Sequence, residues 1–133
     1  MDTNETWLGL TMQEIYDKAV SGLIKQGGPA TNGHKCLYRT ASGRKCGIGQ
    51  VIPDGMYKVE MDTDYQGGSG IAGLIDQGLL PRPSQHMLEF LTKLQFCHDH
   101  ADKASDVFWL IAFKDDAYDL ARLYDLRPHA IWR

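Results

Sequence analysis

The 133-residue sequence lacks several features that would point directly to a class of function. Its longest apolar run, 107–113, is far shorter than the roughly 18 residues that a membrane-spanning helix needs. It has no basic excess, because 14 Lys and Arg face 17 Asp and Glu. That balance argues against a broad duplex-binding face and against a polybasic membrane anchor. A G-x-x-x-x-G-K-[ST] phosphate loop is also absent.

Cysteine is scarce, and three thiols cannot all pair, so we expect reduced cysteines and no disulfide framework. The first residues, 1–6, are polar and acidic, unlike a secretion signal. A composition with 43% hydrophobic and 23% charged residues is that of an ordinary globular protein. These features predict a cytoplasmic protein with one domain over 1–133, a loosely ordered segment over 1–10, and no membrane contact.

Hydrophobic periodicity predicts three long helices. The first spans 11–26, with Thr11 and Glu14 as a capping box and Gly27 as its end. Ser84 is expected to cap a second helix with the buried stripe Met87, Leu88, Leu91, Leu94, Cys97, His98 and Ala101. A third, over about 105–126, is expected to bury Leu110, Phe113, Ala117, Leu120, Ala121 and Tyr124. Short helices are expected within 53–61 and 70–78, and the last two long helices should pair antiparallel.

Residues 36–48 are typical of a β-hairpin with a three-residue loop and Gly43 in the left-handed position. That register pairs Tyr38 with Cys46 and Cys36 with Ile48. These four residues then face the core, whereas Leu37, Arg39 and Lys45 face outward. The predicted fold class is therefore α+β: a mostly helical single domain with one β-hairpin packed against a helical bundle.

Two motifs invite a functional interpretation that their context does not support. A zinc site drawn from Cys36, Cys46, Cys97, His34, His98 and His100 lacks knuckle spacing, so we expect core cysteines and no metal. The string 68–73 fits G-x-G-x-x-G, but no strand precedes it, and we expect a plain loop rather than a dinucleotide site. No cofactor is predicted.

His98 and Asp99 are the best acid–base candidates, although neither is accompanied by an obvious nucleophile. On a helix Gln95 lies one turn before both, so the three side chains can form one polar patch. We expect His98 to be covered and hydrogen-bonded at the edge of the helix packing. A structural histidine is the favoured interpretation, with a functional one as the alternative.

The predicted hairpin is locally cationic, with five basic or histidine side chains and no acid: His34, Lys35, Arg39, Arg44 and Lys45. A solvated dipolar surface is one interpretation. The other is that Arg39, Arg44 and Lys45 form a recognition surface for an acidic partner or a phosphate group.

The motifs C-x-Y-R (36–39), G-x-x-C-x-I-G (43–49), I-P-D (52–54) and L-Q-x-x-H-D (94–99) resemble those of small proteins of unassigned function encoded by bacteriophages and bacteria. Trp109 fits this resemblance, which covers most of 12–126. Gly47 and Gly55 depart from it, where Ala and an acidic residue are expected. The resemblance implies a cytoplasmic, phage- or prophage-encoded accessory factor that binds a host or defence component, without a catalytic assignment.

The sequence as a whole favours a non-enzymatic binding protein whose binding residues are Arg39, Arg44, Lys45, Gln95 and His98. The alternative is a small nucleotide- or anion-binding protein, or an enzyme that uses His98 and the arginines of the hairpin. The expected partner is a protein with an acidic surface or an anionic small ligand. Nucleic acid is disfavoured, and a homodimer is left open.

Overall fold

The computed structural model describes residues 5–31, 36–62, 70–101 and 104–129. It is a small α+β fold, mostly helical, with one two-stranded antiparallel hairpin packed against the helices, as predicted. In chain order the elements are β1 (Thr6–Trp7), β2 (Leu10–Thr11), α1 (Met12–Gln26), the 3-10 helix η1 (Val59–Met61), α2 (Ile71–Asp76), α3 (Gln85–His100) and α4 (Asp106–Leu123).

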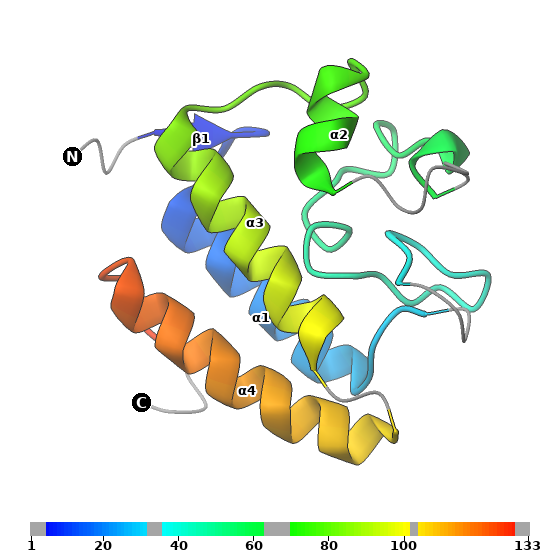
Figure 1. Cartoon of the computed structure of the whole chain (residues 1–133), viewed down its shortest axis with the longest axis vertical. Coiled ribbons are helices and arrows are strands. Elements are labelled where there is room, and N and C mark those ends of the chain that lie inside the picture. The colour runs from blue at the N-terminus through cyan, green and yellow to red at the C-terminus, as the bar shows by residue number, and fades with distance from the viewer. Residues whose placement is uncertain (1–4, 32–35, 63–69, 102–103, 130–133) are drawn as a thin grey trace.

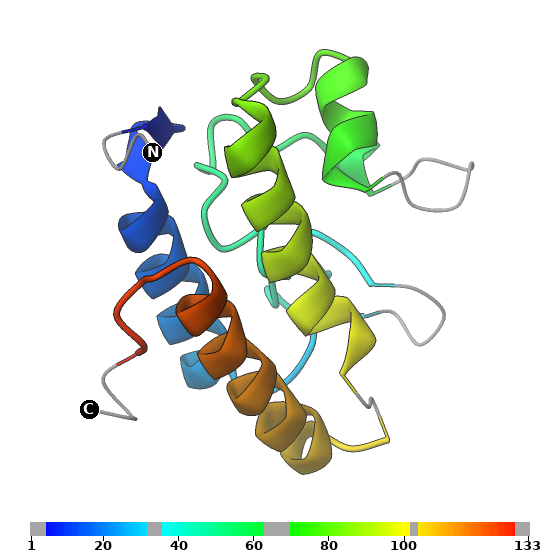
Figure 2. The ribbon, with the colours of Figure 1, turned by 60° about the vertical axis from the view of Figure 1, so that its left-hand side comes forward.

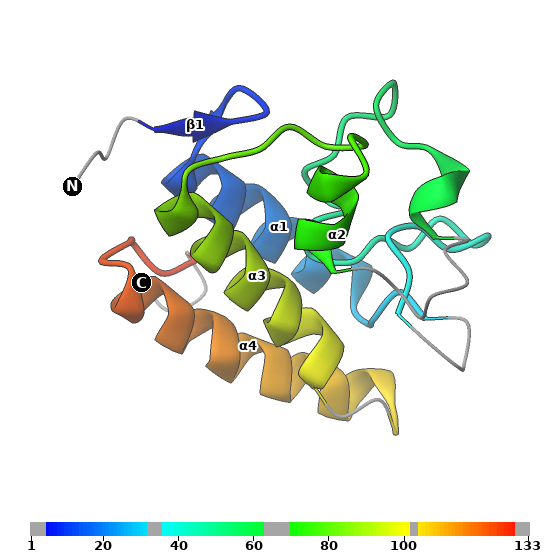
Figure 3. The same ribbon diagram turned by 45° about the horizontal axis from the view of Figure 1, so that its top comes forward.

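The three long helices lie side by side and form the body of the molecule (Figures 1 and 2). Helices α3 and α4 run in opposite directions, as predicted, and α1 runs in the same direction as α3. Residues 36–62 and α2 gather at one side of these helices (Figure 3). Within the described ranges, no helix combines the length and the apolar character needed to cross a membrane.

Local capping explains where the helices begin. The Thr11 hydroxyl accepts from Glu14 N at 3.2 Å, and the Glu14 carboxylate accepts from Thr11 N at 2.8 Å. This capping box confirms the predicted start of α1, which ends before Gly27 as expected. Ser84 and Ser105 cap α3 and α4 through their hydroxyls.

The core differs from the predicted stripes on both α3 and α4. On α4, Trp109 is fully buried and stacks on Phe113 with ring centroids 4.9 Å apart, whereas Leu110 and Tyr124 are half-buried. On α3, Phe90 is buried where Leu88 was expected. In each helix an aromatic side chain, Trp109 or Phe90, is buried in preference to the leucine that was expected there. Burying the larger side chain removes more apolar surface from water.

The hairpin predicted over 36–48 forms only at its turn. Arg39 pairs with Lys45, and Cys46 N donates to Tyr38 O at 3.3 Å, so the predicted register is right here and Gly43 has φ 93°. The expected pairing of Cys36 with Ile48 is wrong, because Cys36 pairs with Thr31 and the chain turns after Cys46, where Gln50 N donates to Cys46 O. A Cβ on Gly49 would collide with the Tyr38 carbonyl oxygen, so this close turn requires glycine.

The hairpin of the fold instead lies at 6–11, within the segment expected to be loosely ordered. Residues 1–4 lie outside the described ranges, but Trp7 is buried and its Nε1 donates to Pro81 O at 2.8 Å. The Glu5 carboxylate accepts hydrogen bonds from both N and Oγ of Ser84. Residues 5–10 are therefore anchored to the connection before α3 through Glu5 and Trp7.

The short connecting helices are shorter than expected. Pro53 opens a turn, closed by hydrogen bonds from Met56 N and Tyr57 N to Pro53 O, and only Val59–Met61 forms a 3-10 helix. Helix α2 covers Ile71–Asp76. Gly68 and Ser69 of the G-x-G-x-x-G string lie outside the described residues.

Candidate functional site

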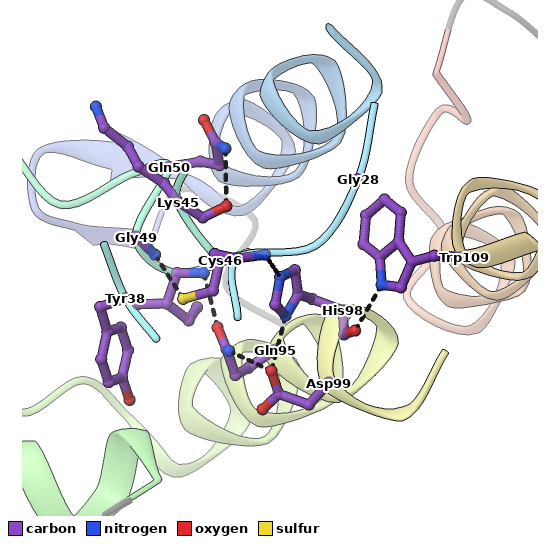
Figure 4. A network of polar contacts seen from close by, with 12 residues as sticks. Gly28, Tyr38, Lys45, Cys46, Gly49, Gln50, Gln95, His98, Asp99 and Trp109 are labelled. Carbon is purple, nitrogen blue, oxygen red and sulfur yellow. Dashed lines mark hydrogen bonds and ion pairs between the residues drawn. The ribbon is translucent and has the colours of Figure 1, made fainter. Parts of the chain in front are cut away.

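The predicted site residues lie in two places. Gln95, His98 and Asp99 lie together on α3, with Trp109 of α4 beyond the His98 ring (Figure 4). Arg39, Arg44 and Lys45 lie on the turn at 38–46.

His98 is fully buried, and both of its ring nitrogens have partners within the chain. Ala30 N donates to Nε2 at 2.8 Å, and Nδ1 lies 2.8 Å from Asp99 Oδ1. Because Nε2 accepts a hydrogen bond, the proton of the neutral ring is on Nδ1, where it is donated to Asp99. The predicted burial and hydrogen bonding of His98 are confirmed, and the ring connects the segment after α1 to α3.

Gln95 extends this network to the turn that follows Cys46. Its Nε2 donates to Asp99 Oδ1 at 2.9 Å, and its Oε1 accepts from Ile48 N at 2.9 Å. Trp109 Nε1 donates to His98 O at 2.9 Å, and the two rings meet edge to face. The expected polar patch of Gln95, His98 and Asp99 therefore forms, and its contacts hold α3, α4 and two loops together (Figure 4).

The buried thiols and the buried phenol near this network resist ionisation. Cys46 is fully buried and accepts a hydrogen bond from Gly49 N at 3.3 Å, and burial strongly raises its thiol pKa. Burial likewise raises the pKa of the Tyr38 hydroxyl, and it raises the pKa of Cys97 to about 12. At neutral pH these groups are uncharged, and neither thiol has the thiolate character that nucleophilic catalysis requires.

One group of three potential metal ligands occurs among the described residues: donor atoms of Cys36, His98 and Asp99 lie within 4.8 Å of one another. In a tetrahedral zinc site such atoms are about 3.4–3.6 Å apart, so small side-chain movements would suffice. The hydrogen bonding of His98 opposes this use. A metal on Nδ1 would displace its proton, and the proton could move only to Nε2, which faces the N–H of Ala30 at 2.8 Å. The absence of a metal thus stays a prediction.

The partly exposed Arg44 side chain is bound to other parts of the chain. Its Nη1 and Nη2 reach Asp106 Oδ1 and Oδ2 at 3.2 and 2.9 Å, and Nη1 also donates to Pro29 O at 3.2 Å. The hydrogen bond between the two side chains raises the pKa of Arg44 and lowers that of Asp106. This bidentate pair joins the 38–46 turn to the first turn of α4.

Arg39 and Lys45 share a different acid. Arg39 Nη2 lies 2.7 Å from Asp54 Oδ1, and Lys45 Nζ lies 3.8 Å from the same oxygen. The Arg39 guanidinium also covers the ring of Tyr57 at 4.6 Å and donates to Ile52 O at 3.2 Å. Only a fifth of the Arg39 side chain is exposed, so the predicted outward face is partly covered by the turn at 53–57.

Sequence reasoning missed the acids that organise this region. Asp62 accepts hydrogen bonds from Tyr38 N at 2.6 Å, Arg39 N at 3.1 Å and the Tyr57 hydroxyl at 2.6 Å. In the sequence it is one of several acids after the predicted hairpin. No local pattern distinguishes it, because two of its partners lie 23 and 24 residues away.

An exposed apolar cluster and a groove lie outside these networks. Val107, Phe108 and Ile111 on α4 are 66%, 60% and 57% exposed. A shallow groove of about 320 Å³ lies between α3 and the end of α4, lined by His86, Glu89, Lys93, Leu123, Tyr124 and Asp125.

Comparison with family models, curated proteins and solved structures found no significant match to this chain, so the resemblance to phage and bacterial proteins stays an expectation.

Proposed function

We propose that this chain is a non-enzymatic binding protein that contacts a partner protein through the outer face of the first half of α4. The observation that carries the proposal is the exposure of three large apolar side chains there: 66% for Val107, 60% for Phe108 and 57% for Ile111. Exposed apolar clusters are typical of protein–protein contact sites.

Helical spacing makes these three side chains one surface. Ile111 lies three residues after Phe108 and four after Val107, so it is a neighbour of both on the helix. The opposite face of α4 is already occupied, because Trp109 and Phe113 are fully buried in the core. The apolar cluster is therefore additional to what the fold itself needs.

The next turns of the same face indicate the chemistry of the partner. Asp115 and Asp119 are exposed and follow Ile111 along the helix. A complementary surface has an apolar pocket that receives Phe108 and Ile111, with Lys or Arg beside it. This partner differs from the acidic one expected for the basic turn. A host or defence protein, as the resemblance implies, is compatible with this chemistry.

An enzymatic role for His98 is less well supported. Its ring is fully buried, and its two nitrogens already bond to Ala30 and Asp99. A general base must reach a substrate proton directly or through one water molecule. The network is better suited to holding loops on the helices than to proton transfer.

Site-specific crosslinking tests the proposal. A benzoylphenylalanine placed at Ile111 should capture one protein in host lysate, and the same group at Val59, which is 61% exposed on η1, should not. With that partner purified, Phe108→Ser combined with Ile111→Ser should weaken binding at least about tenfold, because central apolar contacts dominate interface energies. Val59→Ser is the matched control and should bind like the parent.

Charge reversal tests the chemistry of the partner. Asp115→Lys with Asp119→Lys should weaken the same complex and reduce its sensitivity to salt. Equal crosslinking from positions 59 and 111, or unchanged affinity of the double serine variant, would rule out this face. A crosslink between two copies of the chain would show that the partner is a second copy of this chain rather than a different protein.

A further inference from the structure

We infer that Arg39 and Lys45 form a binding site for a compact oxyanion, a carboxylate or a phosphate group, and that Asp54 occupies this site as an internal competitor. The inference is independent of the apolar face of α4, because it rests on different residues. It assigns a ligand class to two of the residues that the sequence singled out.

Two cations are placed next to each other by the backbone. Arg39 and Lys45 are direct partners in an antiparallel bridge. In such a pair the Cβ atoms are about 4.5–5.5 Å apart, and like charges that face each other in this way destabilise the pairing. A negative charge placed near both relieves the repulsion. Asp54 provides it, with one oxygen 2.7 Å from Arg39 Nη2 and 3.8 Å from Lys45 Nζ.

The Arg39 guanidinium and the backbone of Lys45 are held in place independently of Asp54. Arg39 is fixed by the ring of Tyr57 at 4.6 Å and by the carbonyl of Ile52 at 3.2 Å. The backbone of Lys45 is fixed by Gln26, whose Oε1 accepts from Lys45 N at 2.8 Å and whose Nε2 donates to Lys45 O at 3.0 Å. Because its guanidinium is already fixed, Arg39 loses little freedom when it binds an anion.

Asp54 itself is weakly held. Its side chain is 84% exposed and lies on the turn after Pro53, with exposed neighbours on both sides. Exposed ion pairs contribute little net free energy, so an external anion competes with Asp54 on favourable terms. Arg44 and Asp106 form the contrasting case, because that pair is bidentate and is supported by the carbonyl of Pro29.

The Arg39 guanidinium has more N–H donors than Asp54 engages. Asp54 contacts the guanidinium at Nη2 through a single oxygen. Nε is the one buried side-chain nitrogen or oxygen in the described part of the chain that lacks a hydrogen-bond partner, and because it is buried an external anion reaches the guanidinium at its Nη end. A phosphate group has more acceptor oxygens than one carboxylate and can engage several donors of the fork at once. We therefore expect phosphate to be the stronger of the two ligand types.

Inorganic phosphate is the first probe, titrated into ¹⁵N-labelled protein and followed by NMR. Amide shifts should concentrate in 38–46 and 54–55. Asp54→Asn should lower the phosphate Kd by about fivefold, the factor that corresponds to releasing one exposed ion pair. Lys45→Gln introduced into the Asp54→Asn protein should reverse this gain. Neither Lys45 nor Asp54 is buried, so both variants should keep the fold. Unchanged amide signals from the rest of the protein verify this.

Asp76→Asn is the matched control, because Asp76 is also an exposed aspartate, 2.6 Å from Arg82. It removes the same formal charge, so it reports any general effect of net charge on anion binding. A phosphoserine peptide forms the second arm of the experiment. Tighter binding of the peptide than of phosphate identifies a protein-borne ligand, and equal binding identifies a free anion.

The inference fails if Asp54→Asn changes the phosphate Kd by less than about twofold, since Asp54 then does not compete measurably with phosphate for Arg39 and Lys45. It also fails if Asp76→Asn tightens binding as much, or if the shifts lie away from 38–46. The crosslinking experiment on α4 is unaffected by any of these results.

Discussion

At the scale of single residues, the arrangement around His98 explains how a polar side chain is accommodated in the core. A buried ring nitrogen without a partner is unfavourable, but here Ala30 N and the Asp99 carboxylate satisfy one nitrogen each. Because Asp99 is also bonded by Gln95, and Gln95 by Ile48 N, a single ring is coupled to two loops. Networks of this kind are sensitive to the loss of any member.

His98→Ala should lower the free energy of unfolding by about 2–4 kcal/mol, since it leaves a cavity and removes the acceptor of the buried Ala30 N–H. Urea unfolding measures this change. His86→Ala on the same helix is the control, because His86 is exposed, and it should stay within about 0.5 kcal/mol of the parent. Equal small effects of both variants would show that the network carries little stability, and a selective loss of partner binding would make His98 a functional residue.

At the scale of elements, the first turn of α4 depends on a contact with the 38–46 turn. Asp106 lies in the first turn of the helix, where a carboxylate interacts favourably with the helix dipole, and it also receives both arms of the Arg44 fork. The same turn leads directly into the exposed Val107 and Phe108. The Arg44–Asp106 pair therefore fixes the start of the helix face that we propose as a contact surface.

This pair should make stability depend on pH in a defined direction. The pKa of Asp106 is lower in the folded protein than in the unfolded chain, because Arg44 donates to it. The unfolded chain therefore binds more protons in acid, and the contribution of the pair is complete above about pH 5 and is lost as the pH falls below about 4. Because both side chains are partly exposed, we expect a coupling free energy of only about 0.5–1 kcal/mol at pH 7.

A double-mutant cycle with Arg44→Gln and Asp106→Asn, measured by urea unfolding at pH 7 and pH 3, tests this prediction. The coupling should be present at pH 7 and small at pH 3. A coupling that is the same at both values would show that the Asp106 charge does not contribute through Arg44.

At the scale of the whole molecule, the N-terminal hairpin joins the starts of α1 and α3 at one end of the helical body (Figure 1). Trp7 is buried, and its Nε1 bonds to the carbonyl of Pro81 in the segment before α3. The segment thus links the beginning of α1 to the beginning of α3 across 74 positions of the chain. Tertiary contacts of this kind stabilise short strands that would not form alone.

Trp7→Ala should lower the free energy of unfolding by about 3–5 kcal/mol, the usual effect of deleting a large buried aromatic side chain. Trp7→Phe keeps most of the apolar contact and loses only the bond to Pro81 O, so it should cost about 1–2 kcal/mol. Thermal and urea unfolding of the three proteins measure both values. If Trp7→Ala unfolds like the parent, the hairpin is a dispensable attachment.

The sequence by itself determined the features whose causes lie within a few residues. The bounds of α1 follow from Thr11, Glu14 and Gly27, and the burial of His98 follows from its place on the apolar stripe of α3. The turn register that pairs Arg39 with Lys45 was also predictable, because it depends on a short loop with a left-handed glycine.

Only the tertiary structure decided the remaining features, because their partners are distant in the chain. Arg44 and Asp106 are 62 positions apart, and no periodicity relates them. The hairpin at 6–11 has its turn at Leu8 and Gly9, with φ 54° and 78°, and leucine is not a residue that signals such a turn. The proton of His98 is assigned to Nδ1 only by the Ala30 N–H that approaches Nε2. Local propensity acts over one or two turns of chain, whereas charge pairing and tautomer depend on which surfaces the packed helices bring together.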